Sequence, residues 1–198
     1  MDLVLVRHAR PERIEDADGP ADPPLTAVGH RQARAAAGWL AGEHWDAIYT
    51  SPMVRARETT APLAALLGAD PIVEDGVREF DAEESSYIPM EEMKQDKEAF
   101  QAWLAEEAER NRDAFAGEVI ESLESIVARE KGKRVAVVCH GGVINIWAAH
   151  VLGIESGMFF EPDYTSIHRF LCSSRGHRSM VALNETAHLR SHPDLLLG

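Results

Sequence analysis

The chain has 198 residues, of which 45% are hydrophobic and 27% are charged, enough for one folded domain with a full core. Its formal net charge of −13 argues against nucleic acid and anionic membranes as partners. No segment reaches the roughly 18 apolar residues of a membrane-spanning helix. Cys139 and Cys172 both lie in apolar runs, so we expect buried reduced thiols. The start lacks a basic leader, and we therefore expect a cytoplasmic protein.

The first predicted element is a buried strand that ends in Arg7 and His8. Residues 3–6 form an uninterrupted apolar run, which is typical of a parallel strand buried on both faces. Such strands end at the carboxyl edge of the sheet, where open α/β folds bind their ligands. An imidazole beside a guanidinium suits phosphoryl transfer, because one can attack phosphorus and the other can bind phosphate oxygens. Taken alone, the pair is also compatible with an ordinary strand end at the surface.

A loop and a helix follow this strand. Residues 11–24 are acidic and rich in Pro and Gly, which predicts an irregular loop. Thr26 can cap the N-terminus of an Ala-rich helix that runs to about Ala41.

A second strand end carries another cation. A short strand is predicted over 47–50, and the chain then breaks at Ser51-Pro52 into a helix over 53–67. Arg55 lies in the first turn of this helix, and Gly68 is well placed to end it.

The middle of the chain differs in composition from the rest. A short strand at 71–74 leads to the segment that holds Glu79, and residues 81–118 then combine dense charges with interleaved apolar side chains. We expect an inserted, helical, cap-like segment over about 81–118. Most of its apolar residues would anchor helices on the domain, and some could cap the catalytic mouth.

A third strand also ends in a basic residue. A helix over 118–130 precedes a strand over 134–139, which is followed by His140 and the pair Gly141-Gly142. Glycines permit a sharp turn, and the N-terminus of the helix predicted over 142–152 attracts anions.

The C-terminal part is predicted to be a hairpin and a frayed tail. Residues 165–172 and 180–184 flank a turn sequence, and residues 191–198 are expected to fray. The histidines of this part of the chain are His168, His177, His188 and His192. None lies in a metal-binding motif, so we expect scattered surface histidines and no metal site.

Basic groups thus follow three predicted strands, and the motifs around them resemble one family. The matching segments are Arg7-His8 (RHG), LTAVGHRQA at 25–33 (LTxxGxxQA), SPMVRARETT at 51–60 (SxLxRAxxTA), VREF at 77–80 (LxE) and CHGG at 139–142 (SHGG). The chain resembles the histidine phosphatase superfamily, also called phosphoglycerate mutase-like. Each motif is short, so their order and spacing over residues 3–152 carry the specificity.

The resemblance implies the roles of five residues. His8 would be the nucleophile that becomes phosphorylated, and Glu79 would be the general acid and base. Arg7, Arg55 and His140 would bind the phosphoryl oxygens, with His140 expected to be cationic beside the phosphate. These groups would meet the negative charge of the phosphate without a metal ion or another cofactor.

Two assignments have alternatives. Without the resemblance Glu79 would be read as an ordinary surface glutamate, and the fallback acids are Asp81, Glu83 and Glu84. Arg10 is a possible accessory residue that contacts a second anionic group of the substrate; otherwise it is an exposed loop arginine.

The chain departs from the family pattern in the loop after His8. Ala9 replaces the usual Gly, Pro11 replaces the usual Ser or Thr, and Ile14 stands where many members have Asn. The last two positions often contact the transferred phosphate, so the loop's contribution to the pocket is expected to differ.

We therefore expect a three-layer α/β/α sandwich over residues 1–198, with a mainly parallel central sheet and an antiparallel edge strand. The expected function is metal-independent hydrolysis of a small-molecule phosphomonoester through a phosphohistidine. The alternatives are a phosphoglycerate-type mutase, a phosphoprotein-directed member, or a catalytically weak binding member of the family. The sequence leaves a homodimer open.

Overall fold

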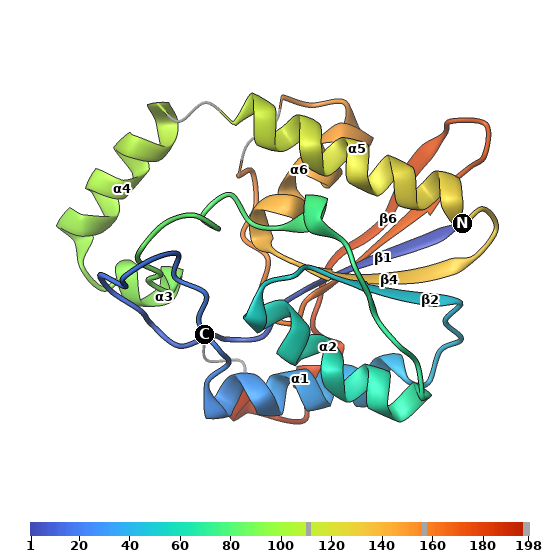
Figure 1. Cartoon of the computed structure of the whole chain (residues 1–198), viewed down its shortest axis with the longest axis horizontal. Helices are drawn as coiled ribbons and strands as arrows, with labels where there is room; N and C mark the ends of the chain where they lie inside the picture. Colours follow the sequence, from blue (N-terminus) through green and yellow to red (C-terminus); the bar gives the residue numbers. More distant parts are fainter. Residues whose placement is uncertain (110–111, 156–157, 196–198) are drawn as a thin grey trace.

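The computed structural model describes residues 1–109, 112–155 and 158–195, and it contains a six-stranded sheet between two layers of helices (Figure 1). The strands are β1 (Asp2–Arg7), β2 (Ala47–Thr50), β3 (Ile72–Val73), β4 (Arg134–Cys139), β5 (Ile167–Cys172) and β6 (Arg178–Glu185). The α-helices are α1 (Ala27–Leu40), α2 (Val54–Leu67), α3 (Met90–Met93), α4 (Lys97–Glu109), α5 (Asp113–Arg129) and α6 (Gly141–Leu152). Short 3-10 helices cover Asp75–Val77, Ala187–Leu189 and Pro193–Leu195.

The sheet has the order β3-β2-β4-β1-β5-β6. Strands β3, β2, β4 and β1 are parallel, whereas β5 pairs antiparallel with β1 and β6 pairs antiparallel with β5. The predicted α/β fold, with a mainly parallel sheet and an antiparallel edge, is confirmed. The antiparallel part consists of two strands, because the short hairpin turn lets β6 return beside β5.

The core lies on both faces of the sheet, as the apolar run of β1 predicts. Leu3 and Leu5 pack in one cluster with residues of α5 and α6, and Val4 and Val6 pack in another with residues of α1 and α2. Figure 1 shows α5 and α6 above the sheet and α1 and α2 below it. Alternate side chains of a strand point to opposite faces, so a fully apolar strand requires both helical layers.

Several predicted helix ends are found in the structure. The Oγ1 of Thr26 accepts a hydrogen bond of 2.9 Å from the N–H of Gly29, and Gly68 ends α2 with a left-handed φ of 61°. The predicted start of the helix at residue 118 is wrong, because α5 begins at Asp113. Ala116 and Val119 of α5 are buried, so packing on the sheet extends the helix through residues that the charge pattern assigned to the inserted segment.

The expectations for the C-terminal part also need correction. Leu195 is 2% exposed and its carbonyl accepts a hydrogen bond from Gln32, so the tail is docked on α1 as far as this residue. Residues 196–198 of the predicted frayed tail lie outside the described residues. His168 and His188 are buried and not at the surface, because β5 and the 3-10 helix at 187–189 direct them inward.

The segment after Glu79 lies over the same end of the sheet as the loop after β1. Residues 81–89 form no regular helix, and the helical part consists of α3 and α4. Ile14 and Tyr87 exchange two backbone hydrogen bonds of 2.7 and 3.0 Å, which join the loop to this segment. Figure 1 shows α3 beside the loop and α4 reaching outward from the sheet.

Candidate active site

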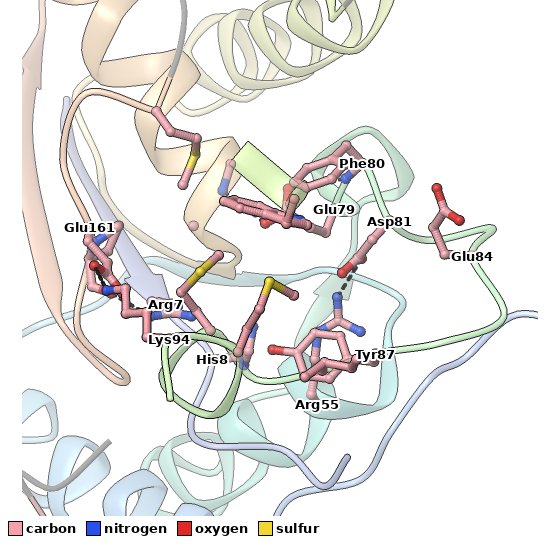
Figure 2. Close-up of a pocket in the computed structure, with 18 of the residues that line it drawn as sticks. Arg7, His8, Arg55, Glu79, Phe80, Asp81, Glu84, Tyr87, Lys94 and Glu161 are labelled. Carbon is pink, nitrogen blue, oxygen red and sulfur yellow. Dashed lines mark hydrogen bonds and ion pairs between the residues drawn. The ribbon is translucent and has the colours of Figure 1, made fainter. Parts of the chain in front are cut away.

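The structure brings the predicted basic residues together at the carboxyl ends of the parallel strands. Arg7 and His8 follow β1, His140 follows β4, and Arg55 comes from the first turn of α2 after β2. The rings of His8 and His140 have centroids 5.1 Å apart. A cavity of about 490 Å³ is lined by Arg7, His8, Arg55 and Glu79 among others (Figure 2).

The geometry of His8 suits a nitrogen nucleophile. The ring is 2% exposed, and its Nδ1 lies 2.8 Å from the carbonyl oxygen of Ala9. Since a carbonyl can only accept, Nδ1 must carry the proton and Nε2 has a free lone pair. Burial, followed by the charges of Arg55 and Arg7, lowers the pKa of His8 well below its ordinary value. The ring is therefore neutral at neutral pH.

Local hydrogen bonds fix the turn behind His8. The N–H of Ala9 donates to the Oγ1 of Thr59 at 2.9 Å, and the hydroxyl of Thr59 donates to the carbonyl of Arg55 at 2.7 Å. Ala9 is fully buried, so its methyl group fits within this turn. Helix α2 thus supports His8 and presents Arg55.

His140 is held by a serine. Its Nε2 lies 2.8 Å from the Oγ of Ser51, and this oxygen accepts a bond of 3.3 Å from the N–H of Met53. The Ser51 hydroxyl can then donate to Nε2, which favours a proton on Nδ1. Among the described residues this Nδ1 has no hydrogen-bond partner. Burial and the charges of Arg55, His8 and Arg7 lower the pKa of His140 well below its ordinary value. The ring is therefore neutral in the ligand-free site, and a cationic His140 beside a bound phosphate stays a prediction.

Each arginine of the site lies against a tyrosine ring. The guanidinium carbon of Arg7 is 4.2 Å from the ring centroid of Tyr164, and that of Arg55 is 4.7 Å from Tyr87. Arg55 is fully buried and its Nη2 donates to Asp81 at 2.9 Å. The Nε atoms of both arginines are buried without a hydrogen-bond partner in the part of the chain that the structure describes. Such donors are suited to the oxygens of an anionic ligand.

Glu79 is held at the edge of the cavity by two backbone amides. Its Oε2 accepts from the N–H of Gly142 at 2.8 Å, and its Oε1 accepts from the N–H of Phe80 at 3.1 Å. Burial and the neighbouring carboxylate of Asp81 raise the pKa of Glu79 to about 7, against the opposing effect of these amides. A Cβ at Gly142 would lie 2.2 Å from Oε1, so the close approach requires glycine.

The other candidate residues have different surroundings. Arg10 forms ion pairs of 3.4 Å with Glu91 and Glu92, and it is absent from the cavity lining. Glu83 pairs with Arg78 at the surface at 3.4 Å. Of the fallback acids, Asp81 and Glu84 line the cavity, and Figure 2 shows Asp81 joined to Arg55.

Sequence reasoning missed the supporting side chains Ser51, Thr59, Tyr87 and Tyr164. The first two lie within the SPMVRARETT motif, where their positions beside Arg55 were a usable signal. The two tyrosines lie in segments with no regular pattern, and only the fold brings them onto the arginines.

Neither a metal cluster nor a membrane span is found within residues 1–109, 112–155 and 158–195. No group of three or more His, Cys, Asp or Glu side chains there has an arrangement that could hold a metal ion. No helix in the same ranges is long and apolar enough to cross a membrane.

Comparison with known proteins gives the family. The model of the histidine phosphatase superfamily (branch 1) matches residues 3–186. The chain belongs to this superfamily. Phosphoserine phosphatase 1 of Hydrogenobacter thermophilus is 31% identical to this histidine phosphatase, over 94% of this chain and 93% of its own. The metal-independent phosphoserine phosphatase of Arabidopsis thaliana is 28% identical over 72% of this chain and 65% of its own.

Solved structures agree with this family and with the fold. Phosphoserine phosphatase from Entamoeba histolytica, in complex with 3-phosphoglyceric acid, superposes with a TM-score of 0.75 at 25% identity, covering 95% of this chain and 98% of its own. The family and the named relatives support a phosphatase of the histidine phosphatase type.

Proposed function

We propose that this histidine phosphatase hydrolyses a phosphomonoester without a metal ion, through a phosphohistidine on His8. The observation that carries the proposal is the hydrogen bond of 2.8 Å between Nδ1 of His8 and the Ala9 carbonyl. It leaves Nε2 unprotonated and fixed beside two arginines, which is the state a nitrogen nucleophile needs.

In the first step, Nε2 of His8 attacks phosphorus and the bond from phosphorus to the ester oxygen breaks. Arg7, Arg55 and Nδ1–H of His140 bind the three non-bridging oxygens, where negative charge must be stabilised. Glu79, whose raised pKa of about 7 keeps much of it protonated, donates a proton to the leaving oxygen.

In the second step, water attacks the phosphorus of phosphohistidine and gives a proton to the Glu79 carboxylate. The nitrogen–phosphorus bond breaks, phosphate leaves, and Nε2 regains its lone pair. The segment over 81–109 acts as a cap over this site: Tyr87 lies on Arg55, and side chains of α3 and α4 line the cavity.

Rapid-quench labelling with a ³²P-labelled alkyl phosphate, in the presence of a chelator, tests this function. We expect an acid-labile, base-stable label on the protein that is lost in His8→Ala and kept in His177→Ala, since His177 is exposed on the hairpin. Turnover by His8→Ala at more than a trace of the wild-type rate would refute the role of His8.

A product assay distinguishes hydrolysis from mutase activity. With 3-phosphoglycerate and a bisphosphate primer, free phosphate should accumulate faster than 2-phosphoglycerate. Rapid isomer exchange without release of phosphate would favour the mutase alternative.

A further inference from the structure

The cavity that holds His8 and the arginines has a second, apolar part. Met90 of α3, Phe100 and Trp103 of α4, and Met158 and Phe159 of the loop after α6 line it together with the catalytic candidates. Phe100 and Trp103 stack, with centroids 6.0 Å apart and an angle of 12° between the rings. Pockets for small molecules combine such apolar walls with a few convergent polar groups.

One wall of this part is fixed by a buried amide. The Oδ1 of Asn145 in α6 accepts from the N–H groups of Phe159 and Phe160 at 3.1 and 3.3 Å, and its Nδ2 donates to the carbonyl of Phe160 at 3.0 Å. Met158 and Phe159 are nevertheless 45% and 42% exposed. Large apolar side chains held in this way in a cavity present a surface that an apolar ligand would cover.

The charged residues of this part carry both signs, and Lys94, Glu161 and Arg112 each contact another side chain. Lys94 forms an ion pair with Glu161, and both line the cavity, as Figure 2 shows. The guanidinium of Arg112 lies 4.0 Å from the ring centroid of Phe80. A carboxylate on the leaving group would have to replace these existing contacts, and Glu84, which also lines the cavity, carries the same charge.

We propose that the leaving group of the substrate is a bulky apolar or aromatic alcohol, bound between α3, α4 and the loop at 158–160. The inference rests on the proposed phosphatase function of the same site. The predicted leaving group differs from serine, which is the leaving group implied by the name phosphoserine phosphatase of the relatives described above.

Substrates with matched leaving oxygens test this inference. 3-Phenylpropyl phosphate and propyl phosphate release primary alkoxides of similar basicity, so a difference in kcat/KM reports binding of the ring. We expect kcat/KM to be at least ten-fold higher for the phenylpropyl ester, a factor that corresponds to about 1.4 kcal/mol. We also expect kcat/KM for 3-phenylpropyl phosphate to exceed kcat/KM for O-phosphoserine by at least the same factor.

Variants of the apolar wall supply the second readout. Trp103→Ala and Phe100→Ala should each reduce kcat/KM for the phenylpropyl ester at least five-fold and change that for propyl phosphate less than two-fold. Trp39→Ala is the matched control, because Trp39 is 50% exposed on α1 and does not line this cavity.

The outcomes separate this inference from the proposed function. Labelling of His8 by all esters, with equal kcat/KM for the phenylpropyl and propyl esters or a preference for phosphoserine, would overturn the apolar leaving group alone. Absence of both turnover and label on His8 with every ester would overturn the proposed function, and this inference with it.

Discussion

Glu79 is the residue whose protonation the site controls most directly. Two backbone amides hold its carboxylate, while burial and Asp81 raise its pKa to about 7. An alkyl phosphate leaves as a strongly basic alkoxide and needs a proton in the transition state, whereas a nitrophenolate needs little help.

Glu79→Gln keeps the size of the side chain but cannot transfer a proton. We expect it to slow phosphorylation of His8 by about 10²- to 10⁴-fold with an alkyl phosphate and much less with p-nitrophenyl phosphate. Burst kinetics separate this step from dephosphorylation. For the wild type, kcat/KM with the alkyl ester should fall as the pH rises above about 7, because the acid form is then lost.

Glu83→Gln and Glu84→Gln are the controls for this variant. Equal slowing of phosphorylation with both leaving groups in Glu79→Gln, or a selective loss in either control, would show that Glu79 is not the acid.

Arg55 and Arg10 have different surroundings. Arg10 is close to His8 in the sequence, whereas Arg55 lines the same cavity as His8. Arg55 is fully buried and lines the cavity, whereas Arg10 pairs with Glu91 and Glu92 of α3. Loss of a buried, charge-assisted phosphate contact should cost about 2–4 kcal/mol in transition-state binding.

Arg55→Ala should therefore reduce kcat/KM for every ester by a factor that corresponds to about 2–4 kcal/mol. For Arg10→Ala we expect a small loss, because partly exposed ion pairs contribute about 0–1 kcal/mol. Steady-state kinetics on both variants check this order. Equal losses in the two variants would contradict the assignment of Arg55 to the phosphate.

At the scale of elements, α1 is placed by a close contact with the loop after β1. A Cβ on Gly29 would lie 2.1 Å from the carbonyl oxygen of Arg10, and the N–H of Thr26 donates to the same oxygen at 3.0 Å. The glycine of the GHRQ segment thus lets the first turn of α1 approach the backbone that carries His8.

Gly29→Ala should lower the free energy of unfolding by about 1–3 kcal/mol, the usual cost of overpacking. Gly38→Ala in the same helix has nothing within 4 Å of the added Cβ, and it should stabilise by about 0.5–1 kcal/mol. Urea unfolding of both variants provides the comparison. Similar free energies of unfolding for the two variants would mean that the approach of α1 to the Arg10 carbonyl does not require glycine at position 29.

At the scale of the whole molecule, buried neutral histidines make stability depend on pH. Burial is the largest cause of lowered pKa values in His8, His140, His168 and His188, with His168 at about 3 and His188 at about 4. Below pH 6.5 the unfolded chain binds protons that the folded chain does not, so stability is complete above this pH and falls in acid.

His168 and His188 should each lower the free energy of unfolding by about 2 kcal/mol between pH 7 and pH 5, and His8 and His140 act in the same direction. Glu79 acts in the opposite direction, because its raised pKa lets the folded state bind a proton in the same range, and it offsets about one histidine. Urea unfolding at both pH values measures the difference. His168→Gln should reduce the pH dependence of stability, and His177→Gln, at an exposed site, should leave it unchanged. Greater stability at pH 5 than at pH 7 would show that these histidines are not buried in the neutral form.

The family, the strands of the sheet and the basic residues at their ends could be predicted from the sequence alone. This was possible because uninterrupted apolar runs specify buried parallel strands, and topology then gathers whatever follows them at one edge. The motif residues Arg7, His8, Arg55 and His140 are local signals of this kind.

Properties that depend on contacts between distant segments could be established only from the fold. The pKa values of Glu79 and His140 depend on burial and on charges from other elements, which no single motif reveals. The docking of Leu195 and the burial of His168 likewise depend on contacts with residues distant in sequence. Desolvation and packing are properties of the assembled fold, which is why the apolar part of the cavity could be recognised only there.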